Sequence, residues 1–429
     1  DKLETREPAQ REAALMRALA QQVAHAQRNA PAYAELLSGV EAASIDSRAA
    51  LARLPVTRKS ELHARQRTAV HGAGGAAAPA RGERAAALRR DVFGGFSAIG
   101  FGPAMRRVYS SPGPIYEPEG CAADYWRMAR ALHAAGLRAG ERVHNCFSYH
   151  FTPAGAMMEG GAHALGCTVF PGGIGQTEQQ VQAMAELRPA GYIGTPSFLK
   201  LILDKAAELG IALPSLRKAS VGAEAFPAAL RDWLLARGVD AYQSYGTADL
   251  GLIAYETEAR EGLVLDEQVI VEIVRPGTGD PVPDGEVGEV VVTTLNPDYP
   301  LIRFGTGDLS AVLRGACPTG RTNTRIKGWL GRADQTAKVR GMFVHPAQVA
   351  EIVRRCPEVI KSRLVVSGEM ADDRMTLEVE TAGGAVEGLA ERLAGHIRDV
   401  TKLRGEVRLV PAGSLPNDGK VIEDVRRVG

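Results

Sequence analysis

From residue 120 to residue 247 the chain alternates short β-rich runs with single helical segments. Helices are expected at 123–136, 154–166, 177–189, 196–210 and 227–238, with strands between them. Such units predict a parallel sheet with right-handed crossovers, whose ligands bind at the carboxyl ends of the strands. The rim of this sheet would carry polar or turn-forming residues, among them Tyr149, Gly172, Thr195, Glu224 and Tyr245.

Other patterns flank this region. Residues 9–29 are rich in Ala and Gln with helical spacing and predict a peripheral arm, and residues 72–90 predict a mobile loop. After residue 262 the apolar period becomes two, which predicts an antiparallel β subdomain. We therefore expect an α/β fold with a large N-terminal domain at 1–334, of which 1–90 are helical arm and loop, and a small α+β domain at 335–429.

Composition excludes several classes of partner. The 429 residues include 51 Lys and Arg and 50 Asp and Glu, interspersed, so neither nucleic acid nor a membrane is the expected main partner. No apolar run approaches the ~20 residues that span a bilayer, and the charged start of the chain lacks a secretory core. We expect a cytoplasmic protein whose five scattered cysteines are reduced.

Two Gly-broken turns between residues 300 and 346 gather charged side chains. PLIRFGTGDLSAV carries Arg303, Thr306 and Asp308, and GWLGRADQTAKVRGMFVHP carries Arg332 and Asp334. A carboxylate can accept both ribose hydroxyl protons, an arginine can reach a phosphate or the ribose, and glycines let backbone come close. On residue types alone, two solvated surface turns explain the pattern equally well.

The order and spacing of these motifs resemble the ribose-binding and hinge motifs of adenylate-forming enzymes, specifically the phenylacetate–CoA ligase-like branch. AQRNAPAYAEL and LARLPVTRKSEL resemble the opening of the same family, so the resemblance covers nearly the whole chain. It implies that Asp308 and Arg332 hold the ribose and that the small domain turns about Asp334. It also implies that Arg340 and Gly341 face the active site during thioester formation.

Two further turns, VGAEAF and YQSYGTADLG, resemble the adenine-binding and magnesium motifs of this family. The residues that this resemblance assigns to adenine and the phosphates are Gly222, Ala223, Glu224, Tyr245, Gly246 and Thr247. Asp249 stands where the family usually has a glutamate, so it is expected to carry Mg²⁺ with one methylene less. Ala248 lacks the hydroxyl that is usual there.

Near the C-terminus, SLPNDGKVIEDVR resembles the family's lysine motif. The resemblance implies that Lys420 comes beside the carboxylate and the α-phosphate in the first step. Joining a carboxylate to a phosphate brings two anions together, and an ammonium offsets their repulsion. Without the resemblance, a lysine after Asp-Gly is usually a solvated turn residue.

The stretch VYSSPGPIYEPEG departs from the family, which has here a Ser/Thr/Gly-rich loop and a lysine that hold the β- and γ-phosphates of ATP. Only Ser110, Ser111 and Gly113 fit that pattern. Prolines at 112 and 114 remove two N–H donors, the lysine is absent, and Glu117 and Glu119 add negative charge. Either the loop no longer grips triphosphate, or it does so through Mg²⁺ or by pointing its acids away.

Relatives often carry a structural zinc held by one Cys, one His and a Cys-x-Cys pair. The matching positions here are Thr257, Val264, Cys317 and Thr319. One thiol cannot make a tetrahedral site, so no zinc is expected.

The acid pocket is expected under HNCFSYHFTPAG at 144–155. Tyr149, His150 and Phe151 would line an aromatic or apolar acyl group there. A hydrogen-bonded rim histidine is an equally good interpretation of His150.

Our first hypothesis is an ATP-dependent carboxylate–CoA ligase that forms an acyl-adenylate and then a thioester, from an aromatic acid. Lys420, Asp249 and Arg332 would be catalytic, and the cofactors would be ATP/AMP, Mg²⁺ and CoA. The small-molecule acid and CoA, or a carrier protein, are the expected partners, and a homodimer is a further possibility. The alternatives are an enzyme with a carrier-protein or amine acceptor, and a nucleotide- or acyl-CoA-binding homologue that does not adenylate.

Overall fold

The computed structural model describes residues 2–71, 92–275, 278–333, 337–340, 342–344, 346–369, 372–381, 387–416 and 420–426. Internal contacts divide the chain into two compact units, 1–331 and 332–429, and each is described by itself. Asp334 and Gly341 lie outside the described residues, as does the whole of the loop predicted at 72–90. The predicted boundary at residue 334 therefore stays a prediction.

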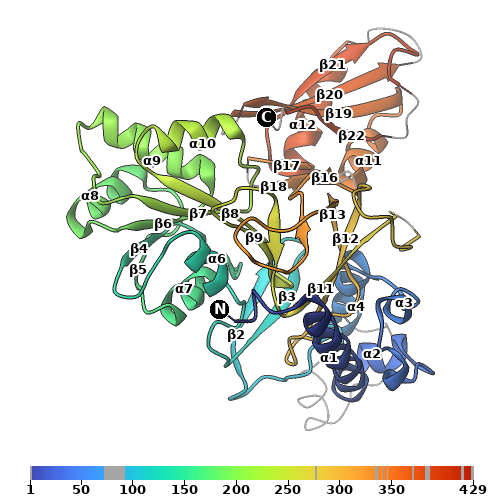
Figure 1. The fold of residues 1–429 in the computed structure, drawn as a ribbon. Helices are drawn as coiled ribbons and strands as arrows, with labels where there is room; N and C mark the ends of the chain where they lie inside the picture. Colours follow the sequence, from blue (N-terminus) through green and yellow to red (C-terminus); the bar gives the residue numbers. More distant parts are fainter. Residues whose placement is uncertain are drawn as a thin grey trace. The chain divides into compact units, whose positions relative to one another are not determined.

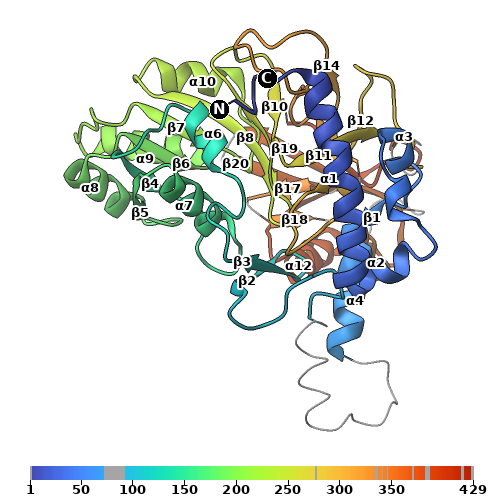
Figure 2. The ribbon, with the colours of Figure 1, turned by 60° about the horizontal axis from the view of Figure 1, so that its bottom comes forward.

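A nine-stranded sheet lies at the centre of the first unit (Figures 1 and 2), in the order β14-β15-β10-β9-β8-β7-β6-β4-β5. Five of its strands run parallel: β4 (Arg142–Asn145), β5 (Thr168–Pro171), β6 (Gly191–Gly194), β7 (Lys218–Val221) and β8 (Asp240–Thr247). The helices between them are α7 (Ala154–Ala164), α8 (Thr177–Leu187), α9 (Pro196–Glu208) and α10 (Ala228–Leu235). The predicted parallel α/β sheet is confirmed.

The rest of this sheet is antiparallel. It consists of β9 (Gly251–Glu256), β10 (Leu263–Leu265), β14 (Val312–Leu313) and β15 (Arg325–Ile326). The sheet changes direction between β8 and β9, so the turn that joins these strands lies at the edge where the parallel strands end.

The helix predicted at 123–136 is shorter than expected, because α6 spans only Ala129–Ala134. The Asp124 carboxylate accepts the N–H groups of Met128 at 2.7 Å and Ala129 at 3.0 Å. Asp124 and Arg127 adopt left-handed backbone angles, with φ of 48° and 64°. A side chain that satisfies N–H groups at a helix start fixes the beginning of the helix there.

A second sheet contains the ribose motif and part of the N-terminal arm. Four of its five strands are β1 (Thr57–Arg58), β13 (Phe304–Ser310), β12 (Gly288–Thr294) and β11 (Val269–Val274), in that order, and the short fifth strand, β16 (Gly331–Arg332), also pairs with β13. The arm consists of α1 (Pro8–Asn29), α2 (Pro31–Leu36), η1 (Ala42–Ser44), α3 (Arg48–Leu51) and α4 (Lys59–His71). Because β1 pairs parallel to β13, with Arg58 opposite Gly305, the arm is part of the structure around this motif.

The predicted placement of Arg303 in a nucleotide-binding turn is wrong. FGTGDLS forms strand β13, and Arg303 before it is only 2% exposed. Its guanidinium donates twice to the Glu272 carboxylate, at 3.0 Å each, and also to the carbonyls of Ala52 at 2.8 Å and Gly279 at 2.7 Å. Arg303 therefore joins three chain segments in the interior.

The second unit is a small α+β structure, as predicted. Its sheet has the order β21-β20-β19-β22, with β19 (Val359–Glu369), β20 (Asp372–Thr381), β21 (Glu406–Val410) and β22 (Ile422–Asp424). Helices α11 (Pro346–Arg354) and α12 (Leu389–Thr401) contribute to its apolar core. The short strands β17 (Ala337–Val339) and β18 (Met342–Val344), which pair with each other, precede them. Among the described helices, none has the length and apolarity to cross a bilayer.

Candidate nucleotide and acid site

Two aromatic side chains hold the predicted ribose carboxylate. The Tyr245 hydroxyl donates to Asp308 Oδ2 at 2.9 Å, and Trp329 Nε1 donates to Oδ1 at 3.1 Å. Each carboxylate oxygen has two acceptor positions, so these bonds orient Asp308 and still allow it to accept ribose hydroxyls. Sequence reasoning missed Trp329, although it stands directly before the Leu-Gly-Arg of the second motif.

We expect Asp308→Ala to weaken AMP binding roughly 10- to 100-fold, because two hydrogen bonds to a charged acceptor are lost. Calorimetric titration with AMP measures the change. Asp204→Ala, which removes an exposed carboxylate paired with Lys200 on α9, is the control and should bind AMP as the wild type does. Equal affinities in the Asp308→Ala variant and the wild type would remove Asp308 from the nucleotide site.

The predicted adenine turn follows β7. A Cβ at Gly222 would meet the Ser244 carbonyl oxygen at 2.9 Å, so only glycine fits there. Ala223 adopts a left-handed φ of 64°, and the next carboxylate, Glu224, accepts a 2.6 Å hydrogen bond from Ser197 Oγ. Since β7 and β8 are parallel neighbours, this turn and Tyr245 lie at the same edge of the sheet.

The turn after β8 is tight. A Cβ at Gly246 would meet the Gly251 carbonyl oxygen at 2.5 Å, and Thr247 Oγ1 accepts the Leu250 N–H at 3.1 Å. These contacts place Asp249 inside the turn, with only 4% of its surface exposed.

Asp249, the predicted magnesium ligand, is paired with an ammonium. Lys59 Nζ, at the start of α4, lies 3.0 Å from Asp249 Oδ2, and Oδ1 is buried with no hydrogen-bond partner in the described part of the chain. No cluster of three or more His, Cys, Asp or Glu side chains suited to a metal occurs among the described residues. An ammonium and Mg²⁺ on one carboxylate would repel each other, so these residues do not fit a metal ion at Asp249.

The predicted phosphate loop at 108–120 forms a hairpin, in which the end of β2 (Met105–Ser111) pairs with β3 (Ile115–Gly120) and residues 112–114 make the turn. The Ser110 N–H donates to the Phe151 carbonyl at 2.8 Å. The N–H of Ser111 donates to Glu117 Oε2 at 3.2 Å, and its hydroxyl donates to Glu117 Oε1. Donors of Ser110 and Ser111 that the sequence assigned to phosphates thus bind protein acceptors, which argues against the predicted role of these two residues, and the role of Gly113 stays a prediction.

The two acids of the hairpin have separate environments. Glu119 accepts hydrogen bonds from the Tyr109 hydroxyl at 2.9 Å and from Arg107 at 3.1 Å, which satisfy its charge on the hairpin itself. Glu117 is completely buried. Burial, and then the neighbouring charge of Asp249, raise the pKa of Glu117 to about 8, so it is mostly protonated at neutral pH.

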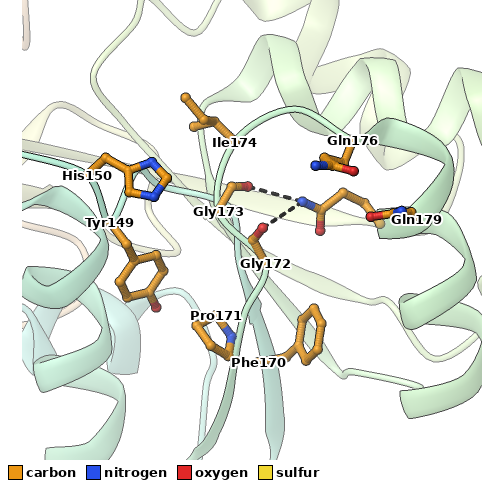
Figure 3. Close-up of a pocket in the computed structure, with 10 residues that line it drawn as sticks. Tyr149, His150, Phe170, Pro171, Gly172, Gly173, Ile174, Gln176 and Gln179 are labelled. Carbon is orange, nitrogen blue, oxygen red and sulfur yellow. Dashed lines mark hydrogen bonds between the residues drawn. The ribbon is translucent and has the colours of Figure 1, made fainter.

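A cavity of about 510 Å³ opens where β4 and β5 end (Figure 3). Tyr149 and His150 lie on one side of the Gly172–Ile174 turn, and Gln176 and Gln179 on the other (Figure 3). The Gln180 amide donates to the Gly172 and Gly173 carbonyls, at 2.9 and 3.2 Å, and so fixes the turn. The glutamines were not predicted, although 176–180 follows directly after the glycine-rich rim.

Two of the three predicted acid-pocket residues line this cavity, whereas Phe151 is not among its lining residues. The Tyr149 hydroxyl donates to Glu159 at 2.7 Å and accepts from Asn145 at 2.8 Å, which holds the ring in place. Phe151 has a left-handed φ of 61° and is 81% exposed. The predicted role of Phe151 as a pocket wall is therefore not supported by its position.

The four positions aligned with the zinc site contain one thiol. Cys317 Sγ lies 3.1 Å from Thr319 Oγ1, and Thr257 and Val264 are buried.

Arg332, Arg340 and Lys420 belong to the second unit. The Arg340 N–H donates to Asp373 Oδ2 at 2.8 Å, and Lys420 Nζ lies 3.8 Å from Glu423 with a half-exposed side chain. Because the two units are described separately, the predicted roles of these three residues at the nucleotide stay predictions.

Comparison with known proteins provides independent evidence. A family model described as AMP-binding enzyme matches residues 121–296, and one described as AMP-binding enzyme C-terminal domain matches residues 341–426. The phenylacetate-coenzyme A ligase of Thermus thermophilus is 34% identical over 317 residues, which cover 67% of this chain and 71% of that protein. The enzyme of the same name from Aromatoleum evansii is 32% identical over 378 residues, 83% of this chain and 79% of the relative.

Among solved structures, a 2-hydroxyisobutyryl-CoA ligase in complex with its acyl-adenylate and CoA matches with a TM-score of 0.77 and 24% identity, covering 100% of this chain and 92% of the other. The amide bond synthetase McbA from Marinactinospora thermotolerans matches with a TM-score of 0.54 and 19% identity, covering 73% and 66%. At these identities the matches establish the fold alone.

Proposed function

The chain belongs to the AMP-binding, adenylate-forming enzymes of the phenylacetate–CoA ligase type, and on that premise we propose that it is an ATP-dependent ligase joining a small carboxylic acid to coenzyme A. The observation that carries this proposal is the Asp308 carboxylate, held by Trp329 and by Tyr245, whose strand β8 is the parallel neighbour of the strand β7 that precedes the Gly222–Glu224 turn. A fixed carboxylate next to an aromatic ring and a glycine turn suits the ribose and base of a nucleotide.

The reaction takes two steps. In the first, a carboxylate oxygen of the acid attacks the α-phosphorus of ATP, the new P–O bond forms, and pyrophosphate leaves. In the second, the thiol sulfur of CoA attacks the acyl carbon, the C–O bond to AMP breaks, and the thiol proton passes to solvent or base. One site serves both steps if a mobile unit exchanges one set of residues for another.

We assign the residues to these steps as follows. Asp308 and Arg332 bind the ribose, and Ala223, Glu224 and Tyr245 surround the adenine. Lys420 offsets the repulsion between the attacking carboxylate and the α-phosphate.

In the second step the small unit turns about Asp334 and brings Arg340 and Gly341 to the site. This assignment rests on the resemblance to the family, because the two units of the structure are described separately.

In this scheme Mg²⁺ is coordinated by the ATP phosphates. We propose that it arrives bound to ATP and is not held by Asp249, whose carboxylate is paired with Lys59. The ion would neutralise phosphate charge during the departure of pyrophosphate.

The acid is proposed to be aromatic, as phenylacetate is in the relatives. It would enter the cavity lined by Tyr149 and His150, whose 510 Å³ exceeds the volume of a single phenyl ring and admits a substituted one. Apolar contact would come from Phe170 and Ile174, which also line the cavity.

Acid-dependent ATP–pyrophosphate exchange, with pooled aromatic and aliphatic acids, tests the first step. We expect Lys420→Ala to lower the exchange rate at least 100-fold, because the variant lacks the ammonium that stabilises the transition state. The control is Arg404→Ala, which removes an exposed cation of the same unit and should leave exchange unchanged. Exchange that persists in Lys420→Ala would refute the assigned role, and no exchange with any acid would refute adenylation.

The proposal also covers the acyl acceptor, the cellular location and the oligomeric state. Thioester formation with CoA, compared with a phosphopantetheinylated carrier protein and with free amines, decides the acceptor. We propose CoA, and a cytoplasmic location where ATP and CoA are available. Light scattering of the purified protein decides between a monomer and a homodimer.

A further inference from the structure

We propose that Lys59, in the N-terminal arm, is the side chain that binds the pyrophosphate end of ATP in this protein, in place of the missing loop lysine and of a metal ion at Asp249. The inference rests on the proposed function, because it assumes that the Asp308 site takes a nucleotide. It concerns a residue that the sequence motifs left without a role.

The first argument is position. Lys59 follows β1, and β1 lies parallel to β13 with Arg58 opposite Gly305, so Lys59 leaves the sheet beside the strand that carries Asp308. Helix α4, which Lys59 begins, packs against both β13 and β3. Gln66 of this helix exchanges two hydrogen bonds with the backbone of Tyr116, at 2.8 and 2.9 Å, and so fixes α4 to the hairpin.

Lys59 therefore lies where three parts of the site meet. These are the ribose strand β13, the turn after β8 that holds Asp249, and the hairpin that holds Glu117. Phosphates extending from a ribose on Asp308 toward the hairpin would pass this ammonium.

The second argument is charge. Lys59 Nζ is 3.0 Å from Asp249 Oδ2, and its charge also acts on Glu117. With Glu117 protonated, Lys59 and Asp249 form a neutral pair, so the site does not repel phosphate as two bare carboxylates would. The presence of Glu117 and Asp249 therefore does not by itself exclude the binding of a triphosphate.

The third argument is exposure. The side chain of Lys59 is 39% exposed, whereas that of Asp249 beneath it is 2% exposed. This ammonium is accessible to an anion from solution.

The hairpin supplies the fourth argument. Its donors at Ser110 and Ser111 are engaged with Phe151 and Glu117, and prolines at 112 and 114 have no N–H. If the protein binds the β- and γ-phosphates, a group next to the hairpin must therefore supply the donor. Among the described residues around Asp249, Lys59 is the cation that the structure pairs with it.

The test compares the affinities of ATP and AMP, because only ATP carries the β- and γ-phosphates. Lys59→Met and Lys59→Gln are titrated calorimetrically with AMP and with a non-hydrolysable ATP analogue, at fixed free Mg²⁺. We expect ATP-analogue affinity to fall roughly 10- to 100-fold, as for loss of a charged hydrogen bond, with AMP affinity changed less than threefold. Lys59→Arg, which keeps a cation, should retain most of the ATP-analogue affinity.

Lys200→Met is the matched control, because Lys200 is 41% exposed and also pairs with an aspartate, Asp204, but lies on α9. Its nucleotide affinities should equal those of the wild type. Equal losses for AMP and the ATP analogue in both neutral Lys59 variants, or no loss for either, would overturn the proposal and leave Lys59 a structural residue. The result is independent of the acid, so a protein that binds nucleotide without acid-dependent exchange would refute the proposed function and leave this inference standing.

Discussion

Replacing Arg303 by Met is expected to lower the free energy of unfolding by about 3–5 kcal/mol, the cost of removing one partner from a buried ion pair. Glu272 would then lie buried without its two 3.0 Å hydrogen bonds, and the carbonyls of Ala52 and Gly279 would each lose a donor. Burial already raises the pKa of Glu272 above its ordinary value, so its charge depends on Arg303. Urea unfolding followed by tryptophan fluorescence measures the loss, since Trp126, Trp233 and Trp329 all belong to the first unit.

The control for this experiment is Arg65→Met, because Arg65 of the same unit pairs with Glu35, whose side chain is 71% exposed, and should contribute little. The two interpretations of Arg303 also differ in nucleotide binding. If it is structural, the folded fraction of Arg303→Met binds AMP as the wild type does. Wild-type stability together with lost AMP binding would restore Arg303 to the nucleotide site.

Arg303 shows a limit of sequence reasoning. A conspicuous Arg in a glycine-rich motif predicts a ligand contact, yet the acceptors that bury it come from residues 52, 54, 272 and 279, far apart in sequence. No local pattern contains that set. The strand–helix alternation of residues 142–247, by contrast, is local, and the parallel sheet followed from it.

The β2–β3 hairpin shows a second limit: the residue types were visible in the sequence, but the partners of their side chains were not. Its prolines and glutamates left two interpretations open: a loop that no longer binds triphosphate, or one that binds it through Mg²⁺ or with its acids pointing away. The orientation of each acid depends on its hydrogen-bond donors. These are Arg107 and Tyr109 for Glu119, and Ser111 for Glu117. Lys59 was overlooked because it lies 190 residues before Asp249, and pairing across such a distance is not visible without the fold.

Trp329 and the glutamines of the cavity were missed for a different reason. Their positions adjoin predicted motifs, but an indole or an amide gives no chemical signal until its partner is known. The Trp329 N–H is informative only because it points at Asp308. Residues that orient a functional group are thus harder to predict from sequence than the group itself.

Stability is expected to depend on pH through Glu117. The pKa of this carboxyl is raised from its ordinary value of 4.5 to about 8 in the folded protein, chiefly by burial and then by Asp249. Between these two pH values the folded state holds a proton that the unfolded state has released. The free energy of unfolding therefore falls as pH rises through this window, by about 1.4 kcal/mol per unit from this group, and the stabilisation is fully present only below pH 4.5.

Glu117→Gln removes this dependence, because the amide cannot ionise, while its oxygen can accept the Ser111 N–H and its NH2 group can donate to the Ser111 hydroxyl. We expect the variant to gain stability relative to the wild type as pH rises from 5 to 9, by several kcal/mol in total, in urea unfolding followed by fluorescence. Glu12→Gln, which alters a half-exposed carboxylate, is the control and should leave the slope unchanged. Parallel pH profiles for Glu117→Gln and the wild type would mean that Glu117 is ionised in the folded protein.

The same profiles connect Glu117 with Lys59. The positive charge of Lys59 lowers the pKa of Glu117 and so opposes the effects of burial and Asp249. In Lys59→Met that opposition is lost, and the fall in stability should continue to higher pH than in the wild type. In the Lys59→Met, Glu117→Gln double variant the extension should vanish, because it arises from the Glu117 carboxyl, whose pKa the ammonium lowers.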